Sequence, residues 1–122
     1  MSGAPGRRRV LIVDAEAPLQ SAYGRYFRDR YELAFAGTGA AALERCATWD
    51  PDVVVVDLHL PDTDGIELLR RLRATHPALP AVITSAAPDL LPVLDALRMT
   101  RTAYLMKPFA PDTLRACIDA AG

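Results

Sequence analysis

The stretch that decides the fold is VVVVDLHLPDTDG, which runs from Val53 to Gly65. Four β-branched valines lead directly into Asp57, and a continuous apolar run of this kind predicts a strand buried on both faces. A loop punctuated by proline and glycine follows, and the amphipathic run from Ile66 to Leu72 predicts a helix. Asp57 therefore stands at the carboxyl end of a buried strand, which is the edge where open α/β sheets bind ligands.

The rest of the chain continues this alternation of strand and helix. The predicted strands cover residues 9–13, 31–36, 53–56, 81–84 and 103–106. The predicted helices cover about 18–27, 40–48, 65–74, 88–99 and 111–121. Such alternation with short connections predicts a parallel sheet covered by helices on both faces. We therefore expect an α/β fold of the doubly wound, flavodoxin-like (βα)5 type, with five parallel strands in the order 2-1-3-4-5.

Two of the predicted helices carry local expectations. Pro92 lies within 88–99, and because proline lacks an amide donor and clashes one turn back, this helix is expected to start late or irregularly. In the alanine-rich helix 40–48, the predicted close-packing positions are Ala41, Leu43 and Ala47.

Length and charge narrow the classes of function. A chain of 122 residues is expected to form one domain over 9–122, preceded by a flexible lead-in over 1–8. The net charge of -1 argues against a nucleic-acid surface. The basic cluster Arg7-Arg8-Arg9 is interpreted as a solvated lead-in to the first strand, in preference to a binding patch.

Compartment follows from what the sequence lacks. No run approaches the ~18 apolar residues of a membrane span, and the N-terminus has no apolar signal-peptide core. We therefore expect a cytoplasmic protein with no membrane partner. Cys46 and Cys117 lie far apart, on helices predicted to cover opposite faces, with no Cys or His at ligand spacing. Neither a disulfide nor a zinc site is expected.

Reactive side chains follow four of the five predicted strands. In chain order they are Asp14, Glu16, Asp57, Ser85 and Lys107. Acidic oxygens suit Mg²⁺, whereas a hydroxyl and an ammonium suit phosphate oxygens. A carboxylate can also attack phosphorus to give an aspartyl phosphate.

Two motifs carry a resemblance to a known family. Residues 57–65 follow the pattern Asp-x-x-Leu-Pro-x-x-Asp-Gly, and residues 104–109 follow aromatic-x-x-Lys-Pro-Phe. With Ser85 between them at a fitting interval, residues 9–121 resemble a receiver domain of the two-component response regulators, in the CheY-like superfamily. The resemblance implies phosphorelay signal transduction.

The resemblance assigns chemical roles to individual residues. Asp57 would accept a phosphoryl group from the phosphohistidine of a histidine kinase or phosphotransfer protein. Ser85 and Lys107 would bind phosphoryl oxygens, and Lys107-Pro108 would be a cis peptide. The domain would catalyse only its own phosphorylation and dephosphorylation, so it is not expected to be an enzyme proper.

The resemblance also implies a switch. Tyr104 would turn inward when Ser85 moves toward the phosphate. The signal would leave through the surface of helix 88–99, strand 103–106 and helix 111–121, toward an output domain or a partner protein.

The metal site departs from the family pattern. By resemblance, Mg²⁺ would be held by Asp57, by the backbone carbonyl of His59 and, through water, by Asp14. Ala15 replaces the second acid, which usually ligates the metal directly, so weaker Mg²⁺ binding is expected. Asp14 and Glu16 are the candidates to compensate. The alternative is a pseudo-receiver, a protein-binding module that works without phosphorylation.

Overall fold

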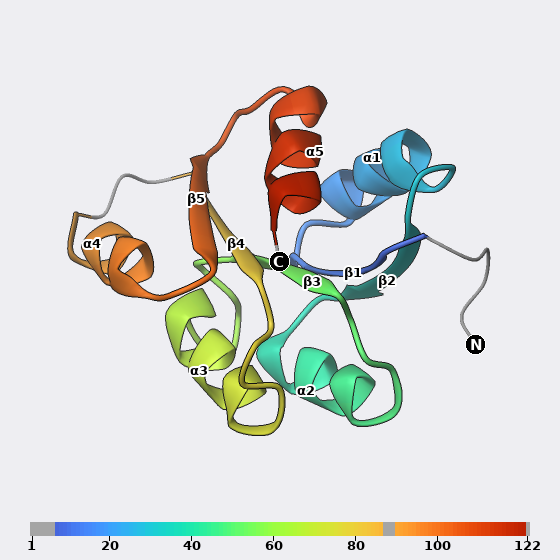
Figure 1. Ribbon diagram of the computed structural model, residues 1–122. Helices are drawn as coiled ribbons and strands as arrows, with labels where there is room; N and C mark the ends of the chain where they lie inside the picture. The colour runs from blue at the N-terminus through green and yellow to red at the C-terminus, as the bar shows by residue number, and fades with distance from the viewer. Residues whose placement is uncertain (1–6, 87–89, 122) are drawn as a thin grey trace.

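The computed structural model describes residues 7–86 and 90–121, and for residues 90–93 the backbone alone. Strands and helices alternate along the described chain (Figure 1). The strands are β1 (Arg9–Val13), β2 (Glu32–Ala36), β3 (Val53–Asp57), β4 (Ala81–Ser85) and β5 (Thr102–Met106). The helices are α1 (Ala17–Phe27), α2 (Gly39–Thr48), α3 (Gly65–Thr75), α4 (Leu90–Arg98) and α5 (Pro111–Ala120).

The five strands form one parallel sheet in the order β2-β1-β3-β4-β5, as predicted. The register aligns the carboxyl ends of the central strands. Val13 pairs with Val56, and Asp57 pairs with Thr84. Because β1 and β3 are neighbours whose crossovers leave in opposite directions, their carboxyl ends form the switch point where such sheets bind ligands.

Helices cover both faces of this sheet, with α1 and α5 on one side and α2 and α3 on the other (Figure 1). The four valines of β3 are buried, and their side chains alternate between the two resulting cores. Val54 and Val56 pack toward α2 and α3, whereas Val53 and Val55 pack toward α1 and α5. The predicted strand buried on both faces is confirmed.

Several local expectations are tested by the packing. In α2 the buried residues are Gly39, Ala42 and Cys46, so the predicted packing at Ala41 and Ala47 is wrong, because both are exposed. Alanine is small enough to be tolerated on either side of a helix, so its position says little about which side is buried.

Pro92 lies close to Leu90, the first described residue of α4. Pro92 is the third described residue of the helix, and a missing amide donor costs nothing in the first turn of a helix. The first two residues of the predicted helix, 88 and 89, lie outside the described residues.

Arg7 and Arg8, which precede β1, bond to backbone carbonyls of the domain and so are not the free, solvated lead-in that the sequence predicts. The Arg7 guanidinium donates to the carbonyls of Arg28 and Tyr31, and Arg8 donates to the Ala121 carbonyl at 2.7 Å.

The free cysteines Cys46 and Cys117 belong to opposite faces of the sheet, as predicted.

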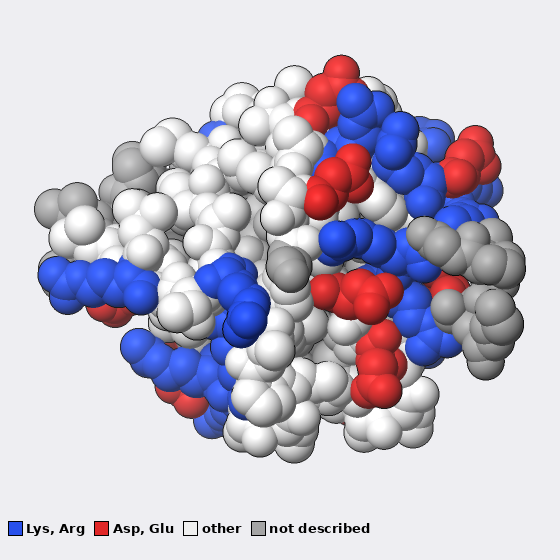
Figure 2. Space-filling model, viewed as in Figure 1, with Lys and Arg blue, Asp and Glu red and all other residues white. Residues whose placement is uncertain are grey.

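Charged groups on the surface are mixed in sign. In the space-filling view, basic and acidic side chains are interspersed on the right-hand side, over α1 and β2 (Figure 2). No helix in the described part of the chain has the length and apolar character needed to cross a membrane.

Candidate functional site

The carboxyl edge of the sheet brings together side chains that follow different strands. Asp14 follows β1, Asp57 ends β3, and Lys107 follows β5. The Lys107 ammonium donates to Asp14 Oδ2 at 2.9 Å and to Asp57 Oδ2 at 3.3 Å. Residues far apart in sequence thus form one cluster, which we call the carboxyl-edge site.

Asp14 is buried and held from several sides. Its amide donates to the Ala36 carbonyl at 3.0 Å, continuing the pairing of β1 with β2. Its Oδ1 accepts from the Glu16 amide at 2.9 Å, and the Gln20 side chain donates to its carbonyl at 2.6 Å. With Oδ1 occupied by the turn, Oδ2 is directed to Lys107. The Asp14 carboxylate is therefore fixed before any ligand arrives.

Lys107 is the only lysine in the chain, and its side chain is 13% exposed. Burial alone would lower its pKa, but the hydrogen bond and charge of Asp14, together with the charge of Asp57, outweigh burial and raise the pKa above its ordinary value. The ammonium therefore stays charged at neutral pH. It is a fixed cation beside Asp57 Oδ2.

Asp57 is held by the loop that follows it. Its Oδ1 accepts from the His59 amide at 3.3 Å, and the Leu58 amide donates to the Thr84 carbonyl at 2.7 Å. The residue is 9% exposed, so it is nearly buried at the carboxyl edge of the sheet.

The predicted switch residues lie on β4 and β5. Ser85 ends β4, is fully buried, and accepts at its carbonyl from the Lys107 amide at 2.7 Å. Lys107-Pro108 is a cis peptide, as the resemblance implies. Tyr104 is half-buried against the core on the α2 and α3 side. Its hydroxyl is buried and bonds to no group among the described residues.

The donor set at this edge consists of oxygens. Asp14 and Asp57 bring two carboxylates, and the His59 carbonyl is the third candidate donor. The described residues contain no group of three or more His, Cys, Asp and Glu side chains placed to hold a metal ion. Mg²⁺ is usually held by one or two carboxylates and keeps several waters, so these residues fit it despite the alanine at position 15.

Glu16 lies at the rim of the site. Its Oε2 is 3.9 Å from the Lys107 ammonium, and its side chain is 63% exposed. The His59 ring is also exposed. The structure thus brings Asp14, Asp57 and Lys107 into direct contact and leaves Glu16 at the margin.

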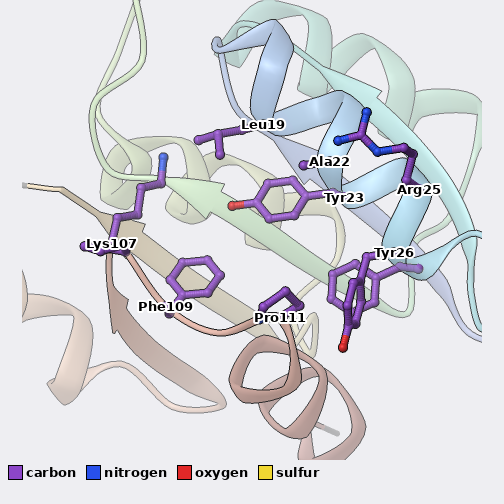
Figure 3. A pocket seen from close by; sticks show the side chains of 10 residues that line it. Leu19, Ala22, Tyr23, Arg25, Tyr26, Lys107, Phe109 and Pro111 are labelled. Carbon is purple, nitrogen blue, oxygen red and sulfur yellow. The ribbon is translucent and has the colours of Figure 1, made fainter.

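A largely apolar pocket of about 460 Å³ adjoins the site between α1 and the start of α5. Figure 3 shows the Lys107 ammonium at one end of this pocket, with Tyr23, Phe109 and Pro111 along it. At the other end the Tyr26 hydroxyl donates to Asp112 at 2.9 Å, bridging the two helices. The sequence did not reveal this pocket, because its walls come from segments far apart in the chain, such as Tyr26 and Asp112, which are 86 residues apart.

Gln20 is a further residue that the sequence did not reveal. A glutamine in the first turns of a helix is ordinary, and only the return of α1 past the end of β1 places its amide on Asp14. No pattern in the sequence marks it.

Fold and site together define a doubly wound α/β domain with an acidic, lysine-bridged cluster at its switch point. A family model described as "Response regulator receiver domain" matches residues 10–119. The chain therefore belongs to the receiver domain family of the response regulators.

Relatives with curated descriptions agree. The DNA-binding response regulator MtrA of Mycolicibacterium paratuberculosis is 36% identical over 115 residues, which are 93% of this chain and 51% of that protein. The transcriptional regulatory protein KdpE of Mycobacterium tuberculosis is 38% identical over 113 residues, which are 92% and 50% of the two chains. The chain spans about half the length of these relatives.

Solved structures show the same architecture. The signal receiver domain of an HD domain-containing protein from Pseudomonas fluorescens matches with a TM-score of 0.88 at 27% identity, covering 94% of each chain. The α/β fold with strand order 2-1-3-4-5 is thereby confirmed as a receiver fold.

Proposed function

We propose that this receiver domain is a phosphorylation switch with Asp57 as the acceptor. The observation that supports this most is the contact of one ammonium, that of Lys107, with both Asp14 and Asp57. Two carboxylates and one ammonium leave the cluster with a negative charge, which suits a cation-assisted phosphate site. The phosphoryl donor would be the phosphohistidine of a histidine kinase or of a phosphotransfer protein.

The transfer is a displacement at phosphorus. A carboxylate oxygen of Asp57 forms the new P–O bond, the P–N bond to histidine breaks, and the imidazole leaves with the bonding electrons. Lys107 already lies beside Asp57 Oδ2 and is placed to neutralise charge on the transferred group. The hydroxyl of Ser85 is the proposed donor to another phosphoryl oxygen.

Mg²⁺ is part of this proposal, held by Asp57, the His59 carbonyl and, through water, Asp14. When bound, it would supply positive charge to the phosphoryl oxygens. Because Ala15 brings no carboxylate, this chain is expected to need more Mg²⁺ than a receiver with two adjacent acids. The domain would catalyse only its own phosphorylation and dephosphorylation.

Output is proposed to leave through α4, β5 and α5. Leu94, Leu97 and Met106 are exposed there, at 39%, 60% and 50%. Exposed apolar groups close together favour contact with a partner. The partner would be an output domain or another protein, and the names of the relatives make a DNA-binding output one candidate. The proposed place of action is the cytoplasm.

A second function has one specific observation in its favour. Ala15 leaves two carboxylates where the family has three, which favours a pseudo-receiver that binds partners without phosphorylation. The two functions differ in one measurable property, the formation of an aspartyl phosphate.

The test is intact-mass measurement after incubation with a small phosphodonor and Mg²⁺. The switch predicts a gain of one phosphoryl group in the wild type and none in Asp57→Asn. Absence of any gain at high donor and Mg²⁺ concentrations would favour the pseudo-receiver.

A further inference from the structure

The loop that follows β3 is hydrogen-bonded to the N-terminus of α2. Both oxygens of Asp62, in this loop, accept hydrogen bonds from the first amides of α2. Gly39 donates to Oδ1 at 2.8 Å and Ala40 to Oδ2 at 3.0 Å. The third amide, of Ala41, donates to the Thr38 side chain at 3.0 Å. Three amides that helix geometry leaves without a partner are thus satisfied, two of them by the loop.

Steric fit at Gly39 provides independent support for this attachment. Gly39 is buried, and a Cβ atom placed on it would lie 2.5 Å from the Cγ2 methyl of Thr63. A contact that short requires the Thr63 side chain to rotate or the loop to shift. The loop and the helix therefore approach closely at Gly39, with the Thr63 methyl in the space that a larger residue would need.

Within the loop, backbone hydrogen bonds connect its tip to its base. Asp62 lies at the tip, where the Leu60 amide donates to the Thr63 carbonyl at 3.1 Å. His59 pairs with Asp64 in an antiparallel bridge at the base. A shift of the tip is therefore transmitted to His59, whose carbonyl is the proposed Mg²⁺ ligand.

We propose that Asp62 is a positioning residue, whose carboxylate fixes the loop to the N-terminus of α2 and so holds the His59 carbonyl at the carboxyl-edge site. This inference rests on the proposed function, because the His59 carbonyl matters only if the domain binds Mg²⁺. The bonds from Gly39 and then Ala40 also lower the pKa of Asp62, so the carboxylate is ionised at neutral pH. Its negative charge suits the positive end of the helix dipole.

The first test measures Mg²⁺ affinity by calorimetry. Asp62→Ala is expected to weaken binding about tenfold, the lower end of the cost of losing a supporting contact at a metal site. Asp62→Asn keeps one acceptor oxygen and is expected to fall between Asp62→Ala and the wild type. Thr38→Ala is the matched control, since it removes a cap from the same helix without touching the loop.

Two results would overturn the inference. One is wild-type Mg²⁺ affinity in Asp62→Ala. The other is a loss in Thr38→Ala as large as that in Asp62→Ala, because then general weakening of α2 would explain both.

The second test perturbs the same contact from the helix side. Gly39→Ala is expected to push Thr63 away and weaken Mg²⁺ binding, and adding Thr63→Ser removes the obstructing methyl and should restore it. A double variant that binds no better than Gly39→Ala would contradict the inference.

Amide hydrogen exchange separates this inference from the proposed function. In metal-free protein, the Gly39 and Ala40 amides should exchange faster in Asp62→Ala than in the wild type. If the wild type binds no Mg²⁺, the metal step of the proposed function fails and the role of Asp62 in metal binding fails with it, whereas the exchange rates still show whether the attachment exists. If the wild type binds Mg²⁺ and Asp62→Ala binds it equally well, only the positioning role fails.

Discussion

Lys107 joins carboxylates that follow two different strands, at 2.9 Å from Asp14 and 3.3 Å from Asp57. At the scale of single residues, this contact was predictable, because strand ends of a parallel sheet meet at one edge. The hydrogen bonds of Gln20 to Asp14 and of Asp62 to Gly39 were not predictable. The bond of Gln20 joins residues only six apart but depends on how the chain turns from β1 into α1, and the bond between Asp62 and Gly39 depends on how the loop after β3 packs on α2.

Position 15 offers the sharpest test at this scale. Ala15→Asp adds a carboxylate beside Asp14, and because a hard dication depends on anionic oxygen ligands, Mg²⁺ affinity should rise several-fold. Calorimetry measures this directly, with Ala15→Asn as the uncharged control of similar size. Unchanged affinity in Ala15→Asp would mean that Asp14 or Glu16 already supplies the missing ligand.

At the scale of elements, strand and helix bounds agree with the sequence to within a residue or two. Strands such as β3 and β4 are buried along their whole length, so their apolar runs define them well. The buried side of α2 was predicted poorly, because alanines occur on several sides of this helix and its sides differ little in hydrophobicity. The buried side of an element could be predicted where apolar and polar side chains clearly alternate, and helix or strand propensity added less.

The junction of β3 with α3 depends on Gly65. A Cβ there would lie 2.6 Å from the Asp57 carbonyl oxygen and 3.0 Å from Leu58 Cα, and neither backbone atom can move cheaply. Gly65→Ala should therefore lower the free energy of unfolding by about 1–3 kcal/mol, as overpacking does. Urea denaturation followed by circular dichroism measures the change.

Gly24→Ala is the matched control for Gly65. In α1 the new methyl would meet only Phe35 Cζ at 3.7 Å, an ordinary contact. Since alanine is the better helix former, this variant should gain up to about 1 kcal/mol. Equal effects of the two substitutions would contradict the account of the β3–α3 junction.

At the scale of the whole molecule, stability should fall in alkali because of Tyr23. Burial raises the pKa of this tyrosine to about 12; the nearby charge of Lys107 lowers the pKa by a smaller amount, and that of Asp14 raises it. The folded protein thus keeps the Tyr23 proton, which the unfolded chain loses at about pH 10. The contribution of the neutral Tyr23 to the free energy of unfolding is therefore complete below that pH and is lost as the pH rises toward 12.

Tyr23→Phe isolates this contribution. Between about pH 9 and about pH 11, the wild type should lose about 1 kcal/mol more free energy of unfolding than Tyr23→Phe. Urea denaturation at the two pH values gives both numbers. Parallel losses in the two proteins would show that Tyr23 ionises alike in the folded and unfolded chains.

The central claim is that Asp57 accepts the phosphoryl group. Its most direct test is chemical mapping: after incubation with a small phosphodonor and Mg²⁺, borohydride reduces an acyl phosphate to an alcohol and marks the residue that carried it. Peptide mass mapping should then find the mark at Asp57 alone, and no mark in unphosphorylated protein. A mark on Asp14, on Glu16 or on no carboxylate at all would contradict the claim.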